Sequence, residues 1–155
     1  MKSKTAGKCI GCLFAMLLTV AVAAPAHADD HSCSLARAAG TYGVSDSGTI
    51  VGVGLRAAVA LLTLDGEGTI QGTVTASLNG GVSSTTLSGT YSVNSDCTGT
   101  TTFGEYDSSG NLLVTATVAL VWDDNMRVFR FLFTSAVQPD GTVLATVING
   151  DATKR

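Results

Sequence analysis

Residues 69–93 read TIQGTVTASLNGGVSSTTLSGTYSV, and they decide the fold. Apolar and polar side chains alternate along this stretch on both sides of an Asn-Gly-Gly turn at 79–81. Such alternation is typical of an antiparallel strand that buries one face and exposes the other. The turn between the two runs indicates a β-hairpin. The apolar residues on the expected buried faces are Ile70, Val74, Ala76, Leu78, Leu87, Tyr91 and Val93.

The same alternation continues through the rest of the chain, and turn-forming residues interrupt it at short intervals. We therefore predict an all-β fold of about eight antiparallel strands in an up-and-down barrel, because closing the sheet removes its exposed edges. A two-sheet sandwich is the alternative. The expected strands lie near 41–46, 54–64, 69–79, 84–94, 98–106, 112–122, 126–136 and 142–148.

Two segments could contain helix. Residues 55–62, LRAAVALL, have a helix-like composition, but an Asp-Gly turn and an alternating strand follow directly, so we predict a strand there. Residues 32–39 are expected to form one short helical turn that begins at Ser32 or Ser34, because serine is a favoured N-cap residue.

The first 28 residues have the features of a secretory signal peptide. Lys2, Lys4 and Lys8 precede an apolar run at 13–24, and Ala26-His27-Ala28 has the small-x-small pattern of a cleavage site. The apolar run is too short to span a bilayer. We predict cleavage before Asp29, a single β-barrel domain over 29–155, and a secreted or periplasmic location.

The charge of the expected mature chain restricts its partners. Removing residues 1–28 from the 155 leaves 127, and it removes three of the nine basic residues and none of the twelve acidic ones. The net charge is then about −6, which argues against nucleic acid and against an anionic membrane surface. No apolar run after residue 28 reaches the roughly 20 residues of a membrane helix. We expect neither a nucleic-acid nor a membrane partner.

Four cysteines fall into two pairs with different fates. Cys9 and Cys12 form a C-x-x-C motif inside the segment that we expect to be removed. Cys33 and Cys97 remain, and an isolated pair in an exported protein is most simply a disulfide. The bond would close a loop of about 65 residues and would stabilise the fold by roughly 4 kcal/mol. A nucleophilic Cys97 is less consistent with the sequence, because the mature chain has a single histidine, near its N-terminus.

Two predicted strands are apolar on both faces. Residues 112–122 carry Leu113, Ala119 and Val121 opposite their main apolar face, and residues 126–134 carry phenylalanines on one side and Val128 and Leu132 on the other. A barrel buries only its inner face, so the outer apolar residues need another cover. We therefore expect a homo-oligomer.

Charged residues within predicted strands are the candidates for a binding site. Glu105 shares a strand face with Phe103, and by parity Arg127 shares a face with phenylalanines, whereas Arg130 lies on the opposite face. If these faces line the barrel, a charged pair would converge in an apolar cavity, which is the usual form of a small-ligand site. A structural ion pair is the competing interpretation. The candidate ligand-binding residues are Glu105, Arg127, Arg56, Phe103, Phe129 and Phe131.

Most other carboxylates fall in predicted turns, where aspartate commonly binds backbone N–H groups. No motif for a cofactor, a serine hydrolase, a zinc cluster or a phosphate loop is present, and we expect no cofactor. One metal site depends on the cleavage point. If Asp29 becomes the first residue, its amine, two backbone amides and the His31 imidazole could form a square-planar nitrogen site for Cu(II) or Ni(II).

The segment Gly-Thr-Tyr-x-Val-Asn-x-Asp-Cys-Thr-Gly-Thr at 89–100 follows an earlier Gly-Thr-Tyr at 40–42 and an Asp-Gly-x-Gly turn at 65–68. With these motifs, roughly residues 33–150 resemble a group of small secreted bacterial proteins, mostly uncharacterised. The resemblance implies a compact barrel of the allene-oxide-cyclase-like or calycin kind. Proteins of that architecture bind or isomerise small hydrophobic molecules, and several are trimers. No catalytic residue carries over from the resemblance.

Three functions follow as hypotheses. The leading one is an exported barrel that binds a small hydrophobic molecule. The second is an enzyme of the cyclase or isomerase kind on the same barrel, and the third is a structural or surface-interaction protein without a cavity. Whether the barrel is filled by side chains separates the third from the others.

Overall fold

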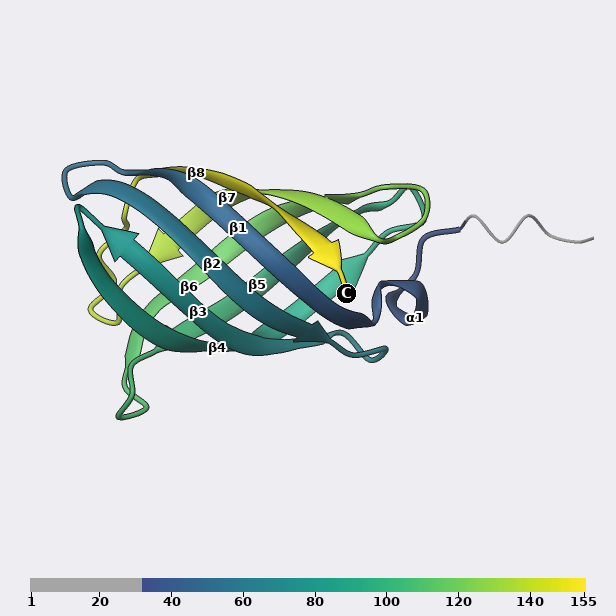
Figure 1. Cartoon of the computed structure of the whole chain (residues 1–155), viewed down its shortest axis with the longest axis horizontal. Helices are drawn as coiled ribbons and strands as arrows, with labels where there is room; N and C mark the ends of the chain where they lie inside the picture. Colours follow the sequence, from purple (N-terminus) through teal and green to yellow (C-terminus); the bar gives the residue numbers. More distant parts are fainter. Residues whose placement is uncertain (1–31) are drawn as a thin grey trace, which may run out of the picture.

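A computed structural model describes residues 32–155, which form a closed barrel of eight antiparallel strands (Figure 1). Every strand pairs with the next in the chain, and β8 pairs with β1 from Tyr42 opposite Lys154 to Ile50 opposite Thr146. This confirms the up-and-down barrel and excludes the sandwich. The elements are α1 (Leu35–Ala38), β1 (Gly40–Ile50), β2 (Gly54–Leu64), β3 (Thr69–Leu78), β4 (Gly81–Val93), β5 (Thr98–Tyr106), β6 (Leu112–Trp122), β7 (Val128–Val137) and β8 (Thr146–Lys154).

The alternation in the sequence determines which side chains face the lumen. On β3, Ile70 and Val74 are buried, while the threonines and Gln71 between them are exposed. Residues 55–62 follow the same two-residue period within β2, as predicted, with Leu62 buried and Leu61 exposed. The lumen is therefore apolar and the outer surface is rich in hydroxyl groups.

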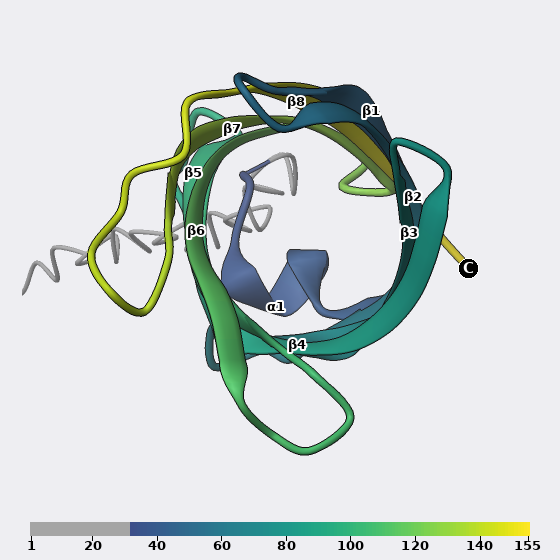
Figure 2. The same cartoon turned by 90° about the vertical axis from the view of Figure 1, so that its left-hand side faces the viewer.

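The short helix α1 closes one end of the barrel. Figure 2 shows the barrel end-on, with α1 lying across its far mouth. Ser34 caps α1 by accepting a hydrogen bond from the Arg37 backbone N–H at 3.4 Å. Within residues 32–155, no helix is long and apolar enough to cross a membrane.

Two inward-facing tyrosines hold α1 in place, and they explain why Gly-Thr-Tyr occurs twice in the sequence. The Tyr42 hydroxyl donates to the Ala38 carbonyl at 2.7 Å. The Tyr91 hydroxyl donates to the Leu35 carbonyl at 3.3 Å and also contacts the Asp65 carbonyl. Burial raises the pKa of Tyr91 to about 12, so this hydroxyl remains a donor at any physiological pH.

Four hairpin turns share a hydrogen bond from the N–H of the fourth turn residue to the carbonyl of the first, and the fourth residue has a positive φ. In the two turns at the end opposite α1, the fourth residue is a glycine, Gly110 or Gly141, because the left-handed backbone conformation favours glycine. At the α1 end it is Cys97 or Met126, with φ of 66° and 55°. Cys97 forms the disulfide, and the Met126 side chain is fully buried. In the two turns at the α1 end, this position therefore carries a side chain with a structural role: Cys97 attaches the segment before α1, and Met126 fills the core.

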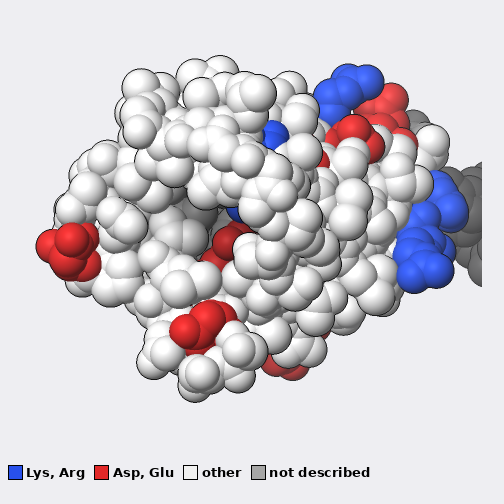
Figure 3. Space-filling model, turned by 60° about the vertical axis from the view of Figure 1, so that its left-hand side comes forward, with Lys and Arg blue, Asp and Glu red and all other residues white. Residues whose placement is uncertain are grey.

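The opposite end of the barrel remains open. The hairpin turns at 51–53, 79–80 and 107–111 and the connection at 138–145 surround its mouth. Figure 3 shows that this end of the molecule is hollowed and that acidic and basic atoms lie within the hollow. The barrel is thus a cup, with α1 at its base.

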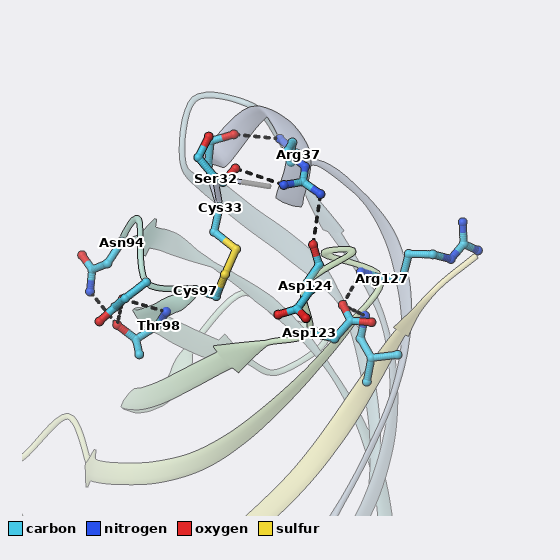
Figure 4. The surroundings of a disulfide bond; sticks show 12 residues. Ser32, Cys33, Arg37, Asn94, Cys97, Thr98, Asp123, Asp124 and Arg127 are labelled. Carbon is cyan, nitrogen blue, oxygen red and sulfur yellow. Dashed lines mark hydrogen bonds between the residues drawn. A yellow bond between two sulfur atoms is a disulfide. The ribbon is translucent and has the colours of Figure 1, made fainter. Parts of the chain in front are cut away.

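The predicted disulfide between Cys33 and Cys97 is present, with the two Cα atoms 5.1 Å apart (Figure 4). It joins the segment before α1 to the β4–β5 turn. Nearby, the Arg37 guanidinium donates to the Asp124 carbonyl at 3.1 Å. These contacts attach α1 to two of the turns around the closed end.

The predicted first strand, 41–46, was too short. The run Ser45-Asp46-Ser47-Gly48 resembles a turn, yet it lies within β1 and pairs on both sides, with Ala57 opposite Ser47 on β2 and Asn149 opposite it on β8. Pairing with two neighbouring strands outweighs the local preference of these residues for turns.

The last two predicted strands were displaced. Residues 142–145 belong mainly to the connection between β7 and β8, and the strand occupies Thr146–Lys154. Asn149-Gly150-Asp151 resembles a turn, but the Phe131 ring packs against Gly150, where a Cβ would lie only 2.6 Å from Cζ of that ring. Strand β7 begins at Val128 and not at Met126, because the turn before it extends through Arg127.

Candidate functional site

Three charged side chains meet inside the apolar lumen. The Arg56 guanidinium binds both carboxylate oxygens of Asp46, with Nε–Oδ1 at 3.1 Å and Nη2–Oδ2 at 3.3 Å. Its Nη2 also lies 3.6 Å from Oε1 of Glu105. The side chains are 12%, 9% and 11% exposed for Arg56, Asp46 and Glu105. We call these three residues the charged cluster.

The barrel closure brings the charged cluster together. Arg56 is opposite Gly48 on β1, and Asp46 is opposite Ala58 on β2, so the pair is a diagonal neighbour on the inner face. Glu105 comes from β5, and β3 and β4 separate that strand from β2. The contact between Arg56 and Glu105 therefore reaches across the lumen and cannot form within one hairpin.

Glu105 has an unusual environment for a carboxyl group. The residue is 8% exposed, and it accepts no hydrogen bond from the residues that the structure describes. Burial raises the pKa of Glu105, and the guanidinium of Arg56 opposes this effect only in part. A buried carboxyl group that accepts no hydrogen bond from the protein can accept one from a ligand.

Space remains on both sides of the charged cluster. The inner chamber, toward α1, offers about 50 Å³ to the centres of water-sized molecules. The outer chamber, toward the open mouth, offers about 60 Å³. Arg56, Glu105 and Phe133 line both chambers and form the partition between them. Side chains that line the inner chamber include Val44, Leu62, Val74, Leu87, Thr101, Val118 and Leu120.

Five of the six predicted site residues line the inner chamber: Glu105, Arg56, Phe103, Phe129 and Phe131. Arg127 does not. It is exposed in the β6–β7 turn, because the Asp123 carboxylate binds the N–H groups of Arg127 and Val128 and delays the start of β7. The prediction that Arg127 shares a strand face with the phenylalanines is therefore wrong.

Asp46 is the cluster member that sequence reasoning missed as a site residue. It stands two positions after Val44 on β1, so strand parity would have placed it on the inner face. The predicted first strand ended at this residue, and Asp46 was not counted among the charged residues within strands. Applying strand parity to the last residue of the predicted strand would have identified it.

Most carboxylates in the turns have structural partners, as expected. Asp65, for example, accepts from the N–H groups of Glu67 and Thr69 at 2.9 and 2.7 Å. Such hydrogen bonds lower the pKa of Asp65, Asp96, Asp107 and Asp140. Within residues 32–155, no three His, Cys, Asp or Glu side chains are placed to hold a metal ion. His31 and the predicted signal peptide lie outside the described residues.

Neither the models of known protein families nor the curated protein sequences match this chain. Two solved structures are similar in fold. One is a redesigned β-barrel, mFAP1, bound to DFHBI, with 16% identity and a TM-score of 0.52, covering 78% of this chain and 98% of that chain. The other is a redesigned β-barrel, b11L5F_LGL, with 16% identity and a TM-score of 0.49, covering 80% and 98%. The first likeness supports the barrel fold alone, and so the resemblance to secreted bacterial barrels is supported only at that level.

Proposed function

We propose that this chain is exported and binds a small hydrophobic molecule in the lumen of its barrel. The observation that carries the proposal is the space that remains in the apolar lumen on both sides of the charged cluster. Apolar walls with a few convergent polar groups are the usual composition of a small-ligand site. The similar redesigned barrel mFAP1 was solved with DFHBI bound, which fits this use of the fold. The apolar N-terminal segment and the disulfide fit an oxidising compartment outside the cytoplasm.

The size of the chambers restricts the ligand. An engineered cavity that binds benzene measures about 150 Å³. Each chamber here is smaller, and the two share a partition of side chains that can change rotamer. A ligand with one ring is therefore too large for either chamber alone, and it enters by displacing the partition.

Filling the inner chamber should weaken this binding. Ala60 lines the chamber, and Ala57 lies on the same strand but points outward and is exposed. We expect Ala60→Leu to weaken the binding of p-xylene at least about tenfold, because the added atoms occupy the space that the ligand needs. Ala57→Leu is the matched control and should leave binding unchanged. Titration calorimetry measures both, and equal affinity in the two variants would contradict the proposal.

An enzyme of the cyclase or isomerase kind is the second candidate. A carboxyl group with a raised pKa beside an apolar cavity has the properties of a general acid or base, and Glu105 is such a group. Native mass spectrometry of the secreted protein would identify a retained ligand. Incubation of that ligand with fresh protein then separates binding from catalysis, because only an enzyme returns it chemically changed.

We also propose that the outer face of β2 packs against a second copy of the chain. Leu55, Val59 and Leu61 point outward with 70%, 61% and 43% exposure. Val59 is flanked by Ser45 on β1 and Thr75 on β3, so small uncharged groups surround it. A self-complementary contact is favoured where no like charges would meet. The outward apolar residues of β6 and β7 that first suggested an oligomer, Leu113, Val121 and Leu132, are exposed as well.

Sedimentation analysis tests the second copy. At micromolar concentration we expect an oligomer that Val59→Lys dissociates, since two buried ammonium groups would meet at the interface. Thr134→Lys, an exposed outward position on β7, is the control and should not change the mass. A monomeric unsubstituted protein would contradict the proposal.

A further inference from the structure

We infer that the lumen ligand is an apolar molecule with one neutral hydrogen-bond donor, a hydroxyl or an N–H, that lies against Glu105. This inference rests on the proposed function and specifies the chemical class of its ligand. It follows from the charge balance of the cluster, from the unfilled hydrogen-bonding capacity of Glu105, and from the lack of other free polar groups around the inner chamber.

The charged cluster has no cation to offer to an anionic ligand. Arg56 already makes a two-point contact with Asp46, and its Nη2 faces Glu105 as well. One guanidinium thus serves two carboxyl groups. A ligand carboxylate would add a further negative charge to a buried site, at a large electrostatic cost. The lumen should therefore reject anions, including fatty acids.

Among the polar side chains that line the inner chamber, Glu105 is the one that makes no hydrogen bond within residues 32–155. Its side chain is 11% exposed, it lines both chambers, and it accepts no hydrogen bond from residues 32–155. A buried acceptor without a donor is costly, and a ligand donor would remove that cost. The raised pKa of Glu105 is compatible with this role, because a protonated carboxyl group still has an oxygen that accepts.

The rest of the inner chamber limits the ligand to one polar group. Thr101 is the other polar side chain outside the cluster in the lining, and its hydroxyl donates to the Thr90 carbonyl at 2.9 Å. The remaining lining is aliphatic and aromatic, with Phe103 and Phe133 packed edge to face. The body of the ligand is therefore a hydrocarbon skeleton.

Three para-substituted toluenes of similar size test the inference: p-xylene, p-cresol and p-toluate, titrated into the full mature chain at pH 7. We expect p-cresol to bind at least about tenfold more tightly than p-toluate, because only the anion meets uncompensated charge. We expect p-cresol also to bind more tightly than p-xylene, because its hydroxyl donates to Glu105.

Two variants assign these differences to Glu105. Glu105→Gln keeps a hydrogen-bond acceptor and removes the charge. It should therefore reduce the difference in affinity between p-cresol and p-toluate, while p-cresol still binds. Glu105→Leu removes the acceptor, so the preference for p-cresol over p-xylene should disappear. Thr101→Val is the control in the same lining and should leave that preference intact, since the Thr101 hydroxyl already has its partner.

The possible failures are distinguishable. If none of the three compounds binds, the proposed function fails and this inference fails with it. If all three bind with equal affinity, or p-toluate binds most tightly, the lumen binds ligands and the inference about their chemistry is overturned. If Glu105→Leu does not fold, the comparison of the three compounds in the unsubstituted protein and in Glu105→Gln still decides the question.

Discussion

Replacing Arg56 with methionine is expected to lower the free energy of unfolding by about 3–5 kcal/mol. The substitution keeps the length of the side chain but leaves Asp46 and Glu105 as two buried carboxyl groups with no cation between them. Removing one partner of a buried ion pair lowers stability far more than replacing the whole pair with apolar residues. Denaturant unfolding of the variant and the unsubstituted protein measures the difference.

Glu105→Gln is the matched control for this effect. It removes a charge from the same cluster but leaves the two-point contact between Arg56 and Asp46 in place. We expect it to be neutral or stabilising at pH 7. If Arg56→Met were as stable as Glu105→Gln, the guanidinium would not be the group that makes the buried carboxylates tolerable.

The titration of Glu105 should contribute to the pH dependence of the unfolding free energy. Its pKa in the folded state lies above the usual value of 4.5, so the folded protein binds this proton more tightly than the unfolded chain. The stability that this group contributes is full below pH 4.5 and is lost as the pH rises through the raised pKa. The turn aspartates have lowered pKa values, so they change the stability in the opposite direction at lower pH. The measurement is therefore the unfolding free energy of the unsubstituted protein minus that of Glu105→Gln, followed as a function of pH.

Removing the disulfide with Cys33→Ala and Cys97→Ala should cost about 4 kcal/mol of unfolding free energy. The bond spans 64 residues of sequence, and such a long closed loop greatly restricts the unfolded chain. This is a large share of the stability of a typical small domain. Denaturant unfolding with and without a reductant measures it.

The unsubstituted protein under reducing conditions is the control, because it should lose the same stability while the double variant should not respond to the reductant. The barrel itself should persist, since the hydrogen bonds from Tyr42 and Tyr91 to α1 do not involve the cysteines. A reductant effect of equal size in the double variant would show that the loss does not come from the Cys33–Cys97 bond.

Much of the architecture could be predicted because a barrel strand has a period of two residues. The alternation at 69–93 identified both faces of β3 and β4, and the isolated cysteine pair identified the disulfide. Glu105 and Arg56 were identified as candidates because a charge within an apolar strand needs an explanation. The signal peptide remains a prediction, since it lies outside the described residues.

Two of the errors occurred where long-range strand pairing outweighed local preference, and a third came from a local turn. Residues 45–48 and 149–151 look like turns, but they lie opposite one another on β1 and β8, and closing the barrel requires both as strand. Arg127 looked like a strand residue, but a hydrogen bond from its backbone N–H to the Asp123 carboxylate holds it in a turn. The deciding contact for residues 45–48 and 149–151 is the long-range pairing of β1 with β8, whereas for Arg127 it is a local hydrogen bond within the β6–β7 turn.

The sequence by itself determined the fold class, the order of the strands, the residues that face the lumen in most of them, and the disulfide. These follow from local alternation, turn chemistry and the small number of cysteines. Only the tertiary structure decided that Asp46, Arg56 and Glu105 meet, that α1 closes one end, and that space remains on both sides of the charged cluster. The physical reason is that strand parity specifies the face of a residue, whereas barrel closure and register specify which residues it meets across the lumen.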